Sequence, residues 1–144
     1  HTRLIELAGE INNSMPDFVI DRLMRVLNKY KKPLNGSKIL LLGVAYKKDI
    51  DDLRESPSLK LVELLEQENA DLIYNDPHIP QFNHKGKEYK SKELTDELLE
   101  EVDAVLIATD HSEYNAENIV EKSEIIFDTR NLTKGIDSDK VYKL

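Results

Sequence analysis

The sequence predicts an α/β domain with a doubly wound, mainly parallel sheet, preceded by a long N-terminal helix. Short, continuously apolar runs alternate along the chain with segments whose apolar residues recur at helical spacing. The apolar runs lack polar alternation, which is typical of parallel strands that are covered on both faces. A group of polar residues follows each run, where an open α/β sheet places its ligand.

The first 33 residues are expected to be helical and distinct from the rest. Apolar residues recur at helical spacing on both sides of Pro16, so we expect an interruption there and a second helix over about 16–31. We interpret residues 1–33 as the end of a central interdomain or dimerisation region, and residues 34–144 as the α/β domain. The alternative is a helix that simply packs on the domain behind it.

The α/β domain is expected to begin with the strand KILLLG, residues 38–43. Ser56 followed by Pro57 predicts a helix start, because a hydroxyl cap and a proline both suit the first turn. A second strand is expected over 70–77, followed by a polar segment with a small hairpin near 85–87.

The remaining elements continue the alternation. We expect a short capped helix over 95–102, a third core strand over 103–111 and a helix over 115–123. A fourth strand over 124–131 and an edge strand over 140–144 complete the pattern. With right-handed crossovers, this order predicts a Rossmann-like doubly wound sheet.

Composition excludes several classes of function. The 144 residues suit one domain, and the formal charge of −8 argues against nucleic-acid binding, which needs a basic surface. The absence of cysteine removes disulfides, thiolate nucleophiles and cysteine-ligated zinc. No apolar run approaches the roughly 20 residues of a membrane span, and no secretory signal pattern is visible, so the cytoplasm is the expected compartment.

Three cations follow predicted strands and can converge on one edge of the sheet: Lys47, Arg54 and Arg130. Lysine provides a point charge and arginine a two-pronged donor set for phosphate, and the helix that begins at Ser56 adds free N–H groups. This pattern indicates a diphosphate site. The alternative is an ordinary solvated loop whose cations are neutralised by its acids, Asp49, Asp51, Asp52 and Glu55.

Other polar residues have two interpretations each. Asp76 stands where a ribose-binding acid would, or it is part of an ordinary turn. Asp110 and His111 form an acid–base pair, or they cap the turn after a strand. Gly43 alone is weak evidence for a dinucleotide site. Three histidines lack any metal-ligand spacing, so no metal site is predicted: His78, His84 and His111.

Five segments that together span most of the chain resemble a known family: IELAGEINNSMPDFVIDRL, GVAYKKDIDDLRESPSLKLVELL, IYNDPHIP, DAVLIATDH and IIFDTRN. They are similar to the C-terminal part of the UDP-glucose/GDP-mannose dehydrogenase family. The pattern G-[VF]-A-[YF]-K-x(5,6)-D-x-R-E-S is long and specific. The first segment is most similar to the branch that acts on UDP-N-acetylated hexosamines, the UDP-GlcNAc or UDP-ManNAc 6-dehydrogenases.

The resemblance implies a nucleotide-sugar dehydrogenase of polysaccharide biosynthesis. Such enzymes oxidise the C6 hydroxyl of a UDP-sugar to a carboxylate with two NAD⁺, through a thio-intermediate on a cysteine. They contain an NAD-binding Rossmann domain, a central dimerisation helix and a C-terminal UDP-binding domain. Because the glycine-rich motif and the cysteine are absent, we expect this chain to be a piece that is inactive alone, from a homodimeric or larger enzyme.

The resemblance also implies roles for individual residues. Lys47 matches the motif lysine that contacts the UDP-sugar, and Tyr46 lines the same pocket. Arg130 matches the arginine that contacts the substrate. Arg54 matches the arginine that reaches across the cleft to the NAD diphosphate, while NAD itself is held mainly by the other domain. No catalytic residue is expected in this chain, and Lys48 has no expected role.

Two other classes of protein fit the pattern. One is a free-standing, receiver-like regulatory module that binds a protein through an acidic cluster at the end of the first strand. The other is a complete NAD-binding domain, which the missing glycine motif disfavours. Titration with UDP, UDP-GlcNAc and NAD⁺ would distinguish the three.

Overall fold

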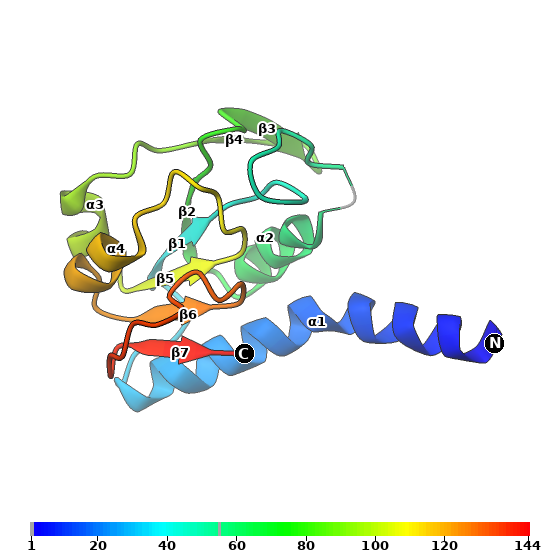
Figure 1. Cartoon of the computed structure of the whole chain (residues 1–144), viewed down its shortest axis with the longest axis horizontal. Helices are drawn as coiled ribbons and strands as arrows, with labels where there is room; N and C mark the ends of the chain where they lie inside the picture. Colours follow the sequence, from blue (N-terminus) through cyan, green and yellow to red (C-terminus); the bar gives the residue numbers. More distant parts are fainter. Residues whose placement is uncertain (1, 55) are drawn as a thin grey trace.

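The computed structural model describes residues 2–54 and 56–144 and contains a five-stranded parallel sheet (Figure 1). All four strand pairings are parallel, which confirms the predicted fold class. In spatial order the strands are β2 (Asp71–Asn75), β1 (Lys38–Leu42), β5 (Ala104–Ile107), β6 (Ile126–Asp128) and β7 (Val141–Lys143).

Helices cover both faces of the sheet. One face carries α1 (Thr2–Lys29) and α2 (Pro57–Gln67), and the other carries α3 (Asp96–Glu101) and α4 (Ala116–Lys122). The side chain that precedes each of the last three helices accepts a hydrogen bond from a backbone N–H of the first turn. These caps are Ser56, Thr95 and Asn115.

Strand β1 is buried on both faces, as its unbroken apolar run predicts. Ile39 and Leu41 belong to the core formed with α1 and α2, whereas Leu40 and Leu42 belong to the core formed with α3 and α4. The sheet therefore separates two apolar layers, and the loops lie at the ends of its strands.

Helix α1 runs without a break through Pro16, so the expected interruption there is wrong. A proline inside a helix costs about 3 kcal/mol, yet the turns that follow are anchored by buried apolar residues. Leu23 and Leu27 are fully buried between α1 and the sheet. This packing offsets the local cost, and the N-terminal half of α1 extends beyond the sheet in Figure 1.

A two-stranded hairpin connects the second strand to the second half of the sheet. Its strands are β3 (Gln81–His84) and β4 (Lys87–Lys90), which confirms the predicted hairpin near residues 85–87. None of the described helices is long and apolar enough to cross a membrane.

The order of the strands reverses between β1 and β5. Open α/β sheets bind ligands in the crevice that forms at such a reversal, outside the carboxyl ends of the strands. Gly43 directly follows β1 at this position and has a φ of +89°. A Cβ atom added there would lie 2.3 Å from the Cβ of Thr109. Only glycine lets the two backbones approach this closely, so Gly43 shapes the crevice.

Candidate functional site

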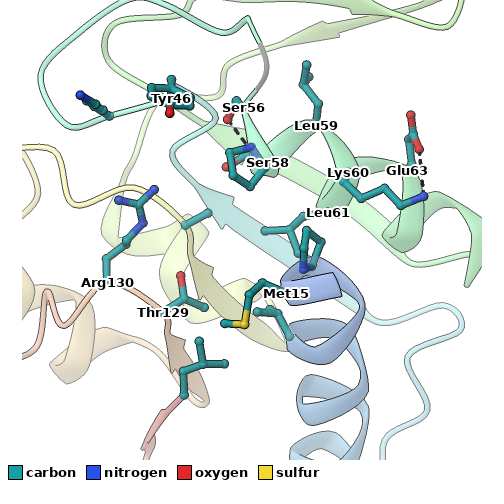
Figure 2. A pocket seen from close by; sticks show the side chains of 16 residues that line it. Met15, Tyr46, Ser56, Ser58, Leu59, Lys60, Leu61, Glu63, Thr129 and Arg130 are labelled. Carbon is teal, nitrogen blue, oxygen red and sulfur yellow. Dashed lines mark hydrogen bonds and ion pairs between the residues drawn. The ribbon is translucent and has the colours of Figure 1, made fainter. Parts of the chain in front are cut away.

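A cavity of about 1280 Å³ lies at the carboxyl ends of the strands (Figure 2). Its walls come from the loop after β1, the start of α2 and the loop after β6. Residues from α1 and the C-terminal Leu144 complete it. Segments that are far apart in sequence thus meet at the place where the fold class predicts a ligand.

Three of the four predicted site residues line this cavity: Tyr46, Lys47 and Arg130. The Lys47 ammonium group lies 5.7 Å from the centroid of the Tyr46 ring, which is within cation–π range. In Figure 2 the Arg130 side chain extends from the end of β6 toward the loop that carries Tyr46. The structure therefore brings two cations and an aromatic ring to one cavity.

The backbone of Arg130 is held by the buried side chain of Asp128. The Asp128 carboxylate accepts hydrogen bonds from Arg130 N at 3.0 Å and from Thr133 N at 2.8 Å. Thr129 also donates its hydroxyl to the Ile107 carbonyl at 2.6 Å. These bonds fix the turn after β6, so the backbone from which the Arg130 side chain extends is held in place.

The fourth predicted residue, Arg54, is not among the residues that line the cavity. Its guanidinium group pairs with Asp52, with 3.2 Å between Nε and Oδ1, and this contact lowers the pKa of the Asp52 carboxyl. Arg54 therefore lies on the same loop as Lys47 but outside the cavity.

In the loop after β1, the acidic residues neutralise only some of the cations. Asp52 pairs with Arg54, as the solvated-loop interpretation expects, while Glu55 lies outside the described residues. Within the part of the chain that the structure describes, neither Lys47 nor Arg130 forms an ion pair. Both charges are available to an anionic ligand.

The start of α2 adds a polar wall to the cavity. Ser56 caps the helix by accepting a hydrogen bond from Ser58 N at 3.2 Å, and Pro57 occupies the first turn. One turn later, Lys60 pairs with Glu63 at 3.6 Å. The N-terminus of α2, with its positive dipole end, is thus part of the cavity lining, which favours an anion nearby.

Another part of the cavity lining is apolar. It is formed by Met15 and Val19 of α1, Leu61 of α2, Ala108 after β5 and Leu144. A cationic rim over an apolar wall suits a ligand with a charged diphosphate and a less polar ring system. The arrangement matches a nucleoside diphosphate better than a free inorganic anion.

Asp76 and His111 form hydrogen bonds with other groups of the protein. The buried Asp76 carboxylate accepts hydrogen bonds from Val44 N at 2.8 Å, Ala45 N at 3.0 Å and His111 Nε2 at 3.0 Å. His111 Nδ1 in turn accepts from Asp49 N at 2.8 Å. Both residues therefore hold the loop after β1, so the geometry favours the interpretation in which they stabilise turns. The acid that pairs with His111 is Asp76 rather than Asp110.

Several lining residues were not identified from the sequence. Lys60 lies four residues after the cap Ser56, and helical periodicity could have placed it on the same side of α2. Met15 and Leu144 come from near opposite ends of the chain, and no local signal links them to the loop after β1.

Comparison with known proteins gives a consistent result. Residues 40–135 match the model of the UDP-binding domain of the UDP-glucose/GDP-mannose dehydrogenase family. The UDP-N-acetyl-D-mannosamine dehydrogenase of Campylobacter jejuni is 36% identical over 115 residues, which are 78% of this chain and 27% of that protein. The enzyme of the same name from Pyrococcus horikoshii is 35% identical over 136 residues, 91% of this chain and 30% of the relative.

A solved structure agrees with the sequence comparison. The structure of the UDP-D-ManNAc dehydrogenase from Pyrococcus horikoshii covers 97% of this chain with a TM-score of 0.80 and 31% identity. The match spans 33% of that chain. This chain therefore corresponds to about a third of the length of these relatives.

Proposed function

The chain belongs to the UDP-glucose/GDP-mannose dehydrogenase family, and from this premise we propose that it is the nucleotide-sugar-binding part of an NAD-dependent 6-dehydrogenase. The proposed substrate is a UDP-N-acetylated hexosamine, in keeping with the names of the relatives. The observation that carries the proposal is that Lys47 and Arg130, from separate loops, line one cavity at the start of α2.

Each residue in the cavity has a proposed role. Lys47 places a point charge, and Arg130 a planar pair of donors, on the two phosphates. Tyr46 offers an exposed aromatic face to a ring of the ligand, and the start of α2 contributes its dipole. These contacts bind and orient the UDP-sugar.

The oxidation itself is assigned to parts of the enzyme that this sequence does not include. NAD accepts the hydride when it is bound, and the residues described here supply no G-x-G-x-x-G cradle for it. Arg54, exposed and outside the cavity, suits the proposed contact with the NAD diphosphate across a domain junction. With no cysteine, the chain has no thiol for the covalent intermediate, so we expect it to be inactive alone. That the enzyme forms a homo-oligomer and that it lies in the cytoplasm both stay predictions.

The receiver-like alternative has less support. It requires free acids at the end of the first strand, whereas the Asp49 carboxylate accepts hydrogen bonds from Ser112, and Asp52 pairs with Arg54. No observation favours a protein-binding acidic cluster over a nucleotide site.

Calorimetric titration tests the proposal. We expect the chain to bind UDP and UDP-GlcNAc weakly and NAD⁺ hardly at all. Lys47→Ala and Arg130→Ala should each lower the affinity for UDP about 10- to 100-fold, the contribution of a charge-assisted hydrogen bond. Lys48→Ala is the matched control, because Lys48 is exposed on the same loop and does not line the cavity.

Two outcomes would contradict the proposal. Tighter binding of NAD⁺ than of UDP would favour a complete NAD-binding domain. UDP affinities that are equal in Lys48→Ala, Lys47→Ala and Arg130→Ala would show that the cavity does not hold the diphosphate.

A further inference from the structure

Four side chains with metal-binding atoms lie close together and are not among those that line the cavity: Asp49, His78, His111 and Glu113. They come from the loop after β1, the turn after β2 and the loop after β5. One ligand atom from each lies within 4.8 Å of all the others. We call these four residues the histidine–carboxylate cluster.

The spacing of the cluster suits a single ion. The His78 Nε2 atom lies 2.9 Å from a Glu113 carboxylate oxygen and 4.0 Å from Asp49 Oδ1. Ligands at about 2.0–2.1 Å from a tetrahedral zinc ion lie roughly 3.3 Å from one another, between these two distances. Small side-chain rotations would therefore bring the three groups to an ion without any change in the backbone.

The second histidine has a fixed tautomer. Asp76 accepts the Nε2–H of His111 at 3.0 Å, so Nδ1, which lies 4.0 Å from Asp49 Oδ1, is the nitrogen that carries the lone pair. A carboxylate behind a histidine is the arrangement that fixes the tautomer of metal-binding imidazoles. Asp49 N–H donates to this Nδ1 at 2.8 Å, so His111 joins as a fourth ligand only by exchanging that bond for the ion.

The carboxylate on the loop is held in place by hydrogen bonds. Ser112 donates its backbone N–H to Asp49 Oδ1 at 2.7 Å and its hydroxyl to Asp49 Oδ2. The neighbouring His78 and His111 rings lie 4.7 Å apart between their centroids. The cluster thus combines one positioned carboxylate with two neighbouring imidazole rings that are tilted by 46° to each other.

We propose that Asp49, His78 and Glu113 bind one Zn²⁺ ion, with His111 as the exchangeable fourth ligand. Mixed imidazole and carboxylate donors favour zinc over magnesium, which prefers oxygen ligands alone. Such an ion would connect the loop that carries Tyr46 and Lys47 to the segments after β2 and β5. The proposal rests on residues outside the cavity and is independent of the proposed function.

Titration of the metal-free chain with ZnCl₂ tests the site. We expect one specific site, a much weaker response to MgCl₂, and a higher Tm with zinc. His78→Ala and Glu113→Gln should each lower the affinity for Zn²⁺ by at least about tenfold, since even indirect partners of metal ligands contribute about 10- to 100-fold. Lys47→Ala should bind zinc like the unaltered chain.

A variant of another histidine is the matched control. The His84 ring pairs with Glu63 at 2.7 Å and is not part of the cluster. His84→Ala should therefore retain the specific site. Zinc affinity that is unchanged in both His78→Ala and Glu113→Gln, or that is lost in His84→Ala instead, would overturn the proposal, as would a preference for magnesium.

Discussion

At the scale of single residues, the site depends on one glycine as much as on its cations. Gly43 combines a positive φ of +89° with a contact distance that leaves no room for a side chain beside Thr109. The next residues, Val44 and Ala45, donate their N–H groups to the buried Asp76 carboxylate. The direction in which the chain leaves β1 toward Tyr46 and Lys47 is therefore set by backbone geometry rather than by the cations themselves.

We expect Gly43→Ala to lower the free energy of unfolding by about 3 kcal/mol or more. The alanine would combine a strained backbone with an overpacked contact, each of which costs about 1–3 kcal/mol. Urea unfolding followed by circular dichroism measures the change. Gly36→Ala is the control: its φ of +82° is similar, but nothing lies within 4 Å of the added Cβ, so it should cost only about 1–2 kcal/mol. Equal losses in both variants would show that the contact with Thr109 is unimportant.

At the scale of elements, the β3–β4 hairpin is fastened to α2 by charged side chains. Glu63 of α2 receives the His84 ring at 2.7 Å and the Lys85 ammonium group at 2.9 Å. Lys87 of the hairpin also pairs with Glu66 of the same helix. The hairpin has only two strands and would be marginal alone, so its attachment to the helix matters for its stability.

The Glu63 contacts predict a pH dependence of stability. The hydrogen bonds from Lys85 and His84 lower the pKa of Glu63 from 4.5 to about 2. A lowered carboxyl pKa stabilises the fold fully above the unfolded value and loses that effect as the pH falls. The difference in free energy of unfolding between the unaltered chain and Glu63→Gln should thus be largest above pH 4.5 and shrink toward pH 2.

Lys85→Met is the control for this effect. Because Lys85 is the main cause of the lowered pKa, its removal should move the Glu63 pKa back toward 4.5 and narrow the window of pH dependence. Unfolding in urea at a series of pH values measures both variants. A difference between Glu63→Gln and the unaltered chain that does not change with pH would contradict the assignment.

At the scale of the whole molecule, an acidic protein presents a locally cationic cavity. The chain has 28 acidic and 20 basic residues, and its net charge of −8 repels extended polyanions. Lys47 and Arg130 nevertheless face one cavity without ion-pair partners among the described residues. The protein should therefore distinguish a small diphosphate, which contacts only the rim, from a nucleic acid, which spans the acidic surface.

This contrast predicts two binding results. The affinity for UDP should fall as KCl is raised, since the cations on the rim are exposed to screening by salt. A labelled DNA duplex should show no binding by fluorescence anisotropy, whether the KCl concentration is low or raised. Duplex binding that competes with UDP would show that the cavity belongs to a larger basic surface.

The elements of the domain could be predicted because their signals are local. The strand at Lys38–Leu42 is an unbroken apolar run, and the helix at Pro57–Gln67 begins at a cap that is visible in the sequence. The family could also be identified, because the block around Tyr46, Lys47 and Arg54 is continuous. Covalent neighbours and helical or strand periodicity are properties of short segments, so the sequence by itself determined these features.

Contacts between distant segments were decided only by the tertiary structure. Helix α1 continues through Pro16 because packing on the sheet outweighs a local preference to break. His84 pairs with the helix, while His78 and His111 meet at the edge of the sheet, although sequence spacing treats the three alike. Such partners are chosen by the free energy of burying and pairing groups from remote parts of the chain, and periodicity within a short segment carries no information about it.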